Sequence, residues 1–250
     1  MSLTIAQPKP ERELRTLRAA LIDAAAQRYR RVDRHAYHFA RSKLRADPVF
    51  SAILQCGLLS EARDILDLGC GIGILEAWLR SARDQYAAGR WPSEWPAPPS
   101  PRHIRGIDHD PRDLGCALAA AGELAEFHCA DARVASLGNP DTVVVLDVLH
   151  YMSYAQQEAV LRNIRAAIDP RGLLLMRIGD ASGGLRFALS EWLDRAVLIA
   201  RRGLFLPLSC RPVAQWRELL QRVGFSCERI MPMSTGTPFA NQLFVAHPSR

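Results

Sequence analysis

Lysine is scarce in this sequence, and paired cysteines, basic blocks and apolar runs of membrane-spanning length do not occur in it. The formal net charge of +6 comes almost wholly from arginine, because Lys9 and Lys43 are the only lysines. The arginines are spread along the chain without interleaved aromatic residues, which disfavours nucleic acid as a partner. No apolar run approaches the roughly 18 to 20 residues that span a bilayer, and no signal-peptide pattern begins the chain. We therefore expect a cytoplasmic protein without a membrane span.

The cysteines form no C-x-x-C pair and have no nearby histidine pattern that would suggest zinc. We expect no metal site and buried free thiols at Cys56, Cys70, Cys116, Cys129, Cys210 and Cys227. With 250 residues, 48% of them hydrophobic and 23% charged, the composition is that of a globular protein. The length lies near the upper limit for one hydrophobic core, so a single domain with appended helices is expected.

Helix-forming residues dominate the first part of the chain. Apolar positions recur at helical spacing from Glu11 to about Arg31, and a second helical stretch runs from Arg34 to Leu44. A third helix is predicted after Asp47-Pro48, where aspartate can cap the helix and proline can occupy its first turn. We expect residues 1–60 to form an N-terminal helical extension or lid, and residues 61–250 to form the main unit.

Beyond residue 62, short strands rich in valine, leucine and isoleucine alternate with helices, which indicates a mainly parallel α/β sheet covered on both faces. The predicted strands are 64–68, 104–108, 125–129, 142–147 and 173–178, followed by an antiparallel hairpin of 225–230 and 242–247. The predicted helices begin near 74 and 111 or span 154–168 and 213–223. A proline-rich insertion loop at 88–102 interrupts the pattern; its tryptophans either pack on the body or border a pocket.

A glycine-rich turn follows the first predicted strand in the sequence Leu66-Asp-Leu-Gly-Cys-Gly-Ile-Gly73. Such a turn lets backbone N–H groups face a ligand with no Cβ in the way. A dinucleotide site prefers G-x-G-x-x-G, but Ile74 stands where that pattern needs glycine or alanine. The carboxylate of Asp67, two residues before the turn, suits an ammonium ion and would repel a pyrophosphate.

This segment resembles motif I of class I S-adenosylmethionine-dependent methyltransferases. The resemblance implies a Rossmann-like fold with a seven-stranded, mostly parallel sheet, an antiparallel C-terminal hairpin and helices on both faces. It also implies that S-adenosylmethionine is the cofactor and that Asp67 holds its amino group. The loop that would wrap the methionine part of the cofactor contains Gly69, Cys70, Gly71 and Gly73.

The same resemblance implies cofactor contacts at the ends of the next two strands. Asp108 would accept hydrogen bonds from the ribose hydroxyls, and His109 would line the adenine slot. After the third strand, Asp131 would accept from the exocyclic amine of adenine and Ala132 would offer its backbone N–H. A solvated loop aspartate is the alternative interpretation of Asp131.

The exit of the fourth strand is where methyl group and acceptor meet in this family. Open α/β sheets bind ligands at the carboxyl ends of strands where the strand order reverses, so Asp147, His150 and Tyr151 should border the pocket. We expect His150 to act as general base, because an unperturbed imidazole pKa of about 6.5 lets it accept a proton from a phenol or hydroxyl at neutral pH. A purely structural histidine is the alternative.

Four residues outside these motifs complete the predicted site. Lys43, or alternatively Arg41, could meet the carboxylate of the cofactor. Tyr37 lies on a helix of the type that covers the cofactor in relatives, although aromatic residues at helical spacing are also common in cores. Arg177 and Arg186 could bind an anionic acceptor by bidentate pairing. Solvated or ion-paired arginines are an equally good interpretation.

We therefore expect methyl transfer to a small organic acceptor, with oxygen preferred over carbon or nitrogen. The segments Tyr37–Leu44 and Met233–Asn241, together with the glycine loop, resemble methyltransferases of bacterial aryl-polyene pigment pathways, which are part of secondary metabolism. That likeness implies a phenolic or aromatic acceptor, or an acyl chain on an acidic carrier protein. The alternatives are an NAD-dependent oxidoreductase, which Ile74 and Asp67 disfavour, and a non-catalytic binding protein on a methyltransferase fold.

Overall fold

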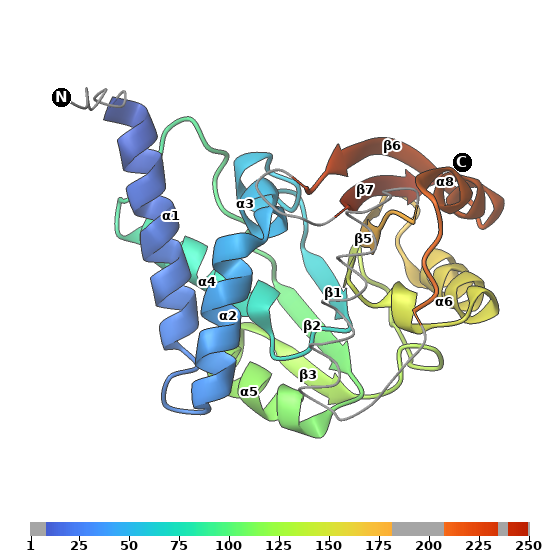
Figure 1. The fold of residues 1–250 in the computed structure, drawn as a ribbon, viewed down its shortest axis with the longest axis horizontal. Helices are drawn as coiled ribbons and strands as arrows, with labels where there is room; N and C mark the ends of the chain where they lie inside the picture. The colour runs from blue at the N-terminus through green and yellow to red at the C-terminus, as the bar shows by residue number, and fades with distance from the viewer. Residues whose placement is uncertain (1–8, 182–207, 235–239, 250) are drawn as a thin grey trace.

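Seven strands form one mixed sheet in the computed structural model, which describes residues 9–181, 208–234 and 240–249 (Figure 1). The strands are β1 (Asp64–Leu68), β2 (His103–Asp108), β3 (Glu126–Cys129), β4 (Thr142–Leu146), β5 (Leu173–Gly179), β6 (Phe225–Pro232) and β7 (Asn241–Pro248). Their order is β3-β2-β1-β4-β5-β7-β6, with β1 to β5 parallel and β7 antiparallel to both β5 and β6. This arrangement confirms the predicted fold, including the C-terminal hairpin.

The strand order reverses between β1 and β4, which are sequence-distant but paired neighbours. Leu66 pairs with Val143 and Asp67 with Val144, so the exits of these two strands lie at the same edge of the sheet. The chain first moves outward from β1 to β2 and β3, and then returns to the other side of β1 for β4. Such a switch point leaves a crevice between the connections that leave the two strands.

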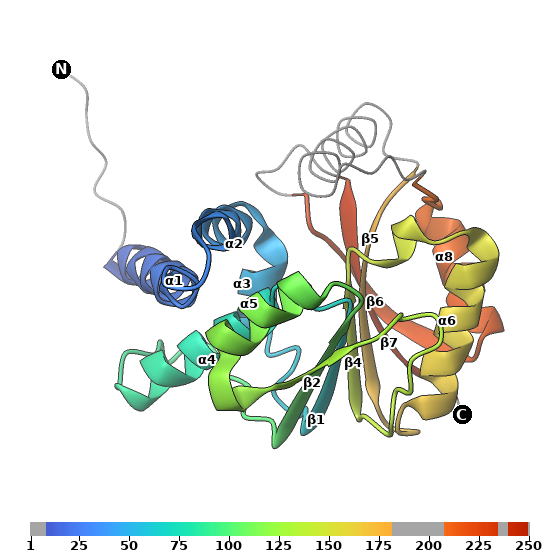
Figure 2. The same cartoon turned by 90° about the horizontal axis from the view of Figure 1, so that it is seen from below.

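Helices cover both faces of the sheet (Figure 2). On one face lie α1 (Lys9–Gln27), α2 (Arg34–Ala46), α3 (Pro48–Gln55), α4 (Ile74–Ala87) and α5 (Pro111–Ala121); on the other lie α6 (Tyr154–Ala167) and α8 (Val213–Arg222). Alternate residues of β1 serve the two layers, since Ile65 packs with the first group and Leu66 with the second. A strand buried on both faces has this near-continuous apolar character, as the sequence predicted.

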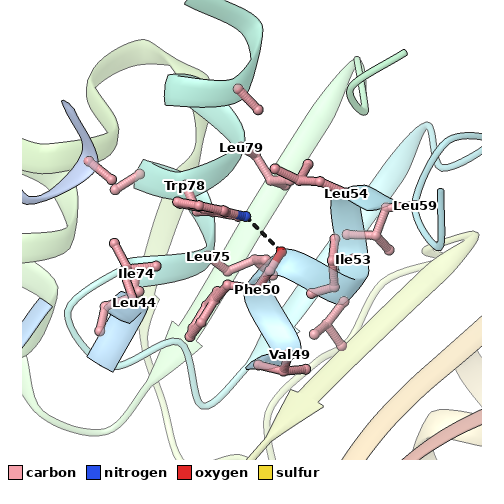
Figure 3. Close-up of a cluster of buried hydrophobic side chains, with 14 of the residues drawn as sticks. Leu44, Val49, Phe50, Ile53, Leu54, Leu59, Ile74, Leu75, Trp78 and Leu79 are labelled. Carbon is pink, nitrogen blue, oxygen red and sulfur yellow. Dashed lines mark hydrogen bonds between the residues drawn. The ribbon is translucent and has the colours of Figure 1, made fainter. Parts of the chain in front are cut away.

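The N-terminal helices share the hydrophobic core of the sheet. Apolar residues of α2, α3 and α4 interdigitate, and the buried indole Nε1 of Trp78 donates to the Phe50 carbonyl at 2.8 Å (Figure 3). Asp47 caps α3 by accepting from the backbone N–H of Val49 at 3.1 Å, and Pro48 occupies the first turn. The sequence therefore predicted the start of this third helix correctly, from the capping aspartate and the proline that follows it.

The proline-rich loop packs on the body of the molecule. Trp91 and Trp95 meet edge to face with ring centroids 5.5 Å apart, and Trp95 is buried in the core. This matches the simpler of the two interpretations of the loop. All six cysteines lie in the described residues and none forms a disulfide bond. The expectation of burial is met fully only by Cys70, because three others are partly buried and Cys56 and Cys129 are exposed. Among the described helices, none is long and apolar enough to cross a membrane.

Candidate functional site

The glycine loop leaves β1 with three glycines in the left-handed region, at φ 83° for Gly69, 54° for Gly71 and 73° for Gly73. The backbone N–H groups of Gly69 and Cys70 donate to the carbonyl of Ile107 at 2.7 and 3.1 Å, which fixes the loop to the end of β2. A Cβ at Gly69 would lie 2.2 Å from the Val148 side chain, whereas no described atom lies within 4 Å of the corresponding position at Gly71. The loop is therefore packed tightly at Gly69 and presents bare backbone at Gly71.

Asp108 lies beside this bare backbone. Its Oδ2 accepts from the N–H of Gly71 at 2.9 Å, and its Oδ1 accepts from the N–H of Asp110 at 3.0 Å. The Nδ1 atom of the exposed His109 lies 3.3 Å from the same Oδ1. Each carboxylate oxygen can accept two hydrogen bonds, so Oδ2, with one donor, retains capacity for a hydroxyl donor. The structure thus brings Asp108, His109 and the glycine loop together.

Two further carboxyl groups are buried behind the loop. Asp67 is 5% exposed and Glu76, in the first turn of α4, is fully buried. Burial raises the pKa of Glu76 to about 7. Burial and the neighbouring Glu76 raise the pKa of Asp67 well above its ordinary value. Sequence reasoning missed Glu76, although an acid within the apolar run Ile74-Leu-Glu-Ala-Trp78 was an available signal.

Two aspartates, one lysine and one arginine form a charge cluster at the ends of β4 and β5. The Arg177 Nε donates to Asp147 Oδ1 at 2.8 Å, and its two terminal nitrogens donate to Asp147 Oδ2 and Asp47 Oδ2. The Lys43 Nζ lies 2.9 Å from Oδ2 of each aspartate. Asp147 has φ 60°, a left-handed conformation rare outside glycine and costing roughly 1–2 kcal/mol. The cluster therefore connects α2 and α3 to the switch-point edge of the sheet.

This cluster decides the status of three predicted residues. Lys43 and Asp147 do lie together at the expected edge, with Lys43 the more exposed of the two cations, its side chain being 31% exposed. The prediction that Arg177 binds an anionic acceptor is not supported, because the side chain is only 1% exposed and its donors are directed at two carboxylates. Arg186 lies outside the described residues.

His150 lies after β4 in a short 3-10 helix, Leu149–Tyr151, with Tyr151 next to it. The two rings are 4.1 Å apart between centroids, and the exposed Tyr151 borders solvent. His150 is 6% exposed, and its Nε2 has no hydrogen-bond partner among the described residues. Burial, assisted by the charge of Lys43, lowers its pKa to about 4. The assumption of an ordinary imidazole pKa was therefore wrong, because it ignored desolvation.

Gln157 holds this strand exit in place. Its buried amide donates to the carbonyls of Leu149 and Met152, both at 3.1 Å, and to Ser209 at 2.6 Å. The N–H of Ser209 donates in turn to the carbonyl of His150 at 2.8 Å. No sequence pattern marks this glutamine, since its partners are backbone groups brought close by the fold.

The residues predicted to read adenine lie after β3. Asp131 accepts hydrogen bonds from Nε and from a terminal nitrogen of Arg133, and this side-chain pairing lowers the pKa of Asp131 to about 2. Ala132 packs partly against the α6 layer. The N–H of Ala130 donates to the carbonyl of Asp108 at 2.9 Å, so this turn adjoins the β2 exit. Tyr37, predicted as a substrate contact, packs partly buried against the core.

Tyr29 in the turn after α1 is a further residue that sequence reasoning missed. Its buried hydroxyl lies 3.0 Å from the carbonyl oxygen of Ile72 and 2.9 Å from that of Gly73, and it donates to them from behind the loop. The N-terminal extension thus contacts the glycine loop directly.

One cavity lies away from all of these residues. It encloses about 290 Å³ at the amino ends of the strands and is lined by residues that include Asp64, His103 and Glu126. Ligands of open α/β sheets bind at the opposite, carboxyl ends of the strands. We therefore place the candidate site at the glycine loop. Among the described residues, no group of three or more acids, histidines or cysteines is arranged to hold a metal ion.

The family model for a methyltransferase domain matches residues 27–230 of this chain. Because that match spans most of the sequence, the chain belongs to the methyltransferase domain family. The match, together with the fold, confirms the resemblance to class I methyltransferases and the prediction that the chain is an enzyme of that class. Among curated proteins, none matches the sequence significantly.

Solved structures with the same fold include methyltransferases of several kinds. The magnesium protoporphyrin IX methyltransferase of Synechocystis PCC 6803, solved with bound SAH, is 20% identical with a TM-score of 0.58 over 94% of this chain and 100% of that one. Mitomycin 7-O-methyltransferase is 17% identical with a TM-score of 0.59 over 97% and 69%. An N-methyltransferase from Bradyrhizobium japonicum WM9, in complex with S-adenosyl-L-homocysteine, is 12% identical with a TM-score of 0.57 over 91% and 100%. At these identities the likeness shows the fold.

Proposed function

We propose that this chain transfers a methyl group from S-adenosylmethionine to a small organic acceptor. The observation that carries the proposal is the bare backbone at Gly71, beside the carboxyl of Asp108, in a loop that follows Asp67 at the switch point of the sheet. A side chain at Gly71 would fill space that is open in the described structure, and the neighbouring acids suit a ligand with hydroxyl and ammonium groups. When bound, the cofactor supplies a methyl group already activated by a sulfonium leaving group.

The chain's own residues fit this cofactor part by part. Asp67 would hold the amino group, Asp108 the ribose hydroxyls, and His109 with the turn at Asp131 and Ala132 the adenine. Lys43 would meet the carboxylate, since its ammonium is the cation of the charge cluster nearest to solvent. The protein's work in such a reaction is largely to position the two reactants in line and to exclude water.

We further propose oxygen as the acceptor atom. The buried ring of His150 is uncharged at neutral pH, because its pKa of about 4 lies far below it, and its Nε2 lacks a hydrogen-bond partner among the described residues. A neutral imidazole can take the proton of a phenol or hydroxyl as the methyl group arrives. Tyr151, at the solvent side of His150, would contact the acceptor. The aryl-polyene likeness extends the acceptor class to acyl chains on a carrier protein.

The proposal is tested by binding first and turnover second. Calorimetry should detect binding of S-adenosylhomocysteine to the wild type. Gly71→Ala should weaken it by about tenfold or more, because overpacking typically costs 1–3 kcal/mol. Gly89→Ala is the matched control: Gly89 also has a positive φ, 67°, and open space at its Cβ position, but it follows the far end of α4.

Turnover is then measured by mass spectrometry with simple phenols, aliphatic alcohols, amines and a carrier-bound acyl chain. Methylation of a hydroxyl supports the acceptor assignment, and methylation confined to nitrogen or carbon contradicts it. If the wild type binds neither S-adenosylmethionine nor S-adenosylhomocysteine, the proposed function is wrong.

A further inference from the structure

Two carboxyl groups from different elements meet behind the glycine loop. Asp67 comes from β1 and Glu76 from the first turn of α4, and they are 5% and 0% exposed. The Oε2 atom of Glu76 lies 3.4 Å from the position of a Cβ at Gly73, so the pair adjoins the backbone of the loop itself. Apart from its own backbone N–H and the Asp67 carboxyl, Glu76 has no hydrogen-bond partner among the described residues.

The titratable groups around the pair add no positive charge. They are Asp108 at the end of β2, Cys70 in the loop, Tyr29 after α1 and Cys116 in α5. Tyr29 directs its hydroxyl to the loop carbonyls.

The nearby cations are engaged elsewhere. Arg28 pairs with Asp84 at 2.5 Å, and the Lys43 and Arg177 charges are balanced by two other aspartates. The Asp67 and Glu76 carboxyls are therefore uncompensated by any described cation.

Two adjacent buried carboxyls cannot both stay ionised without a compensating charge, because desolvation and mutual repulsion both oppose it. Such a pair keeps a proton between its members until a cation arrives. The raised pKa values of both groups agree with this. An ammonium ion that enters beside the loop would supply three N–H donors, and one positive charge that no described cation gives to this pair.

We infer that Glu76 and Asp67 together form the binding site for the amino group of the cofactor, and that cofactor binding displaces the proton shared by the two carboxyls into solvent. The inference rests on the proposed function and adds Glu76 as a binding residue and a proton count to it. No bond between heavy atoms changes: one carboxyl O–H bond breaks, its proton passes to a buffer base in solution, and the ammonium charge of the ligand takes its place.

The test measures protons by calorimetry at pH about 7.5, where the slope of apparent heat against buffer ionisation enthalpy counts the protons released. Phosphate and Tris buffers differ widely in that enthalpy. S-adenosylhomocysteine should release about one proton per molecule bound, and its affinity should rise by about tenfold per pH unit between pH 6.5 and 8. 5′-Methylthioadenosine shares the adenosine and thioether but lacks the amino group, so it should release none.

Variants assign the proton to the pair. Glu76→Gln replaces the shared proton by an amide donor, so we expect S-adenosylhomocysteine still to bind, with proton release and pH dependence largely lost. Asp84→Asn makes the same change on the exposed side of the same helix and should behave as wild type.

Each outcome has a distinct meaning. Binding of S-adenosylhomocysteine to the wild type without proton release overturns the inference and leaves the proposed function standing. Equal proton release with S-adenosylhomocysteine and 5′-methylthioadenosine also overturns it, and this comparison needs no variant to fold. Absence of any binding to the wild type refutes the proposed function itself.

Discussion

Replacing Arg177 tests whether the charge cluster holds the N-terminal helices to the sheet. In Arg177→Met the stem is kept, but Asp47 and Asp147 lose their shared guanidinium and only Lys43 remains to serve both. Removing one partner of a buried ion pair typically costs 3–5 kcal/mol. Because Asp147 is 28% exposed on its side chain and water can reach it, we expect the lower end, about 3 kcal/mol.

Urea unfolding followed by tryptophan fluorescence measures this loss. With an m-value of about 3 kcal/mol/M for a chain of this size, the midpoint should fall by about 1 M, and the melting temperature by about 6–12 °C. Adding Asp47→Asn should recover part of the loss, because it removes a carboxylate left without its guanidinium partner. Arg133→Met, which breaks an exposed bidentate pair, should leave the midpoint unchanged. A shift below about 0.3 M for Arg177→Met would refute the argument.

Three further predictions concern the base, the loop and acid stability. His150→Ala should lower kcat for an oxygen acceptor by about 100-fold or more with little change in cofactor affinity; steady-state kinetics showing a change below about threefold would reject His150 as base. Tyr29→Phe should weaken S-adenosylhomocysteine binding by several-fold in calorimetry, because two loop carbonyls lose their donor. The control Trp78→Phe removes a buried hydrogen bond in the same helical layer and should lower only the melting temperature. Although burial opposes the charge of Asp47, Arg177 and Lys43 hold its pKa below the usual value. The stabilisation by this carboxylate is therefore present above pH about 4 and is lost as the pH falls further. Urea midpoints measured between about pH 6 and 3 should fall more steeply for wild type than for Asp47→Asn, and parallel curves would contradict the pairing.

Local patterns in the sequence were sufficient for the sheet and the glycine loop. A strand buried on both faces requires an apolar run, and a left-handed turn packed against Val148 requires glycine at position 69. The cap at Asp47 was also readable, because an aspartate before a proline satisfies the first turn of the helix that it begins. Features of this kind depend on residues a few positions apart, so they can be predicted from the sequence directly.

Charge pairing and burial were decided only by the tertiary structure. Arg177 and Asp47 are 130 residues apart in sequence, and only the packing of α3 against the sheet brings them into contact. The same applies to Glu76 beside Asp67, and to the burial that makes His150 a weaker base than a free imidazole. Desolvation depends on everything that surrounds a group, and charge pairing on contacts between elements far apart in sequence. The sequence by itself therefore determined the glycine loop and the succession of strands and helices along the chain, whereas the three-dimensional fold determined which charged side chains are available to a ligand.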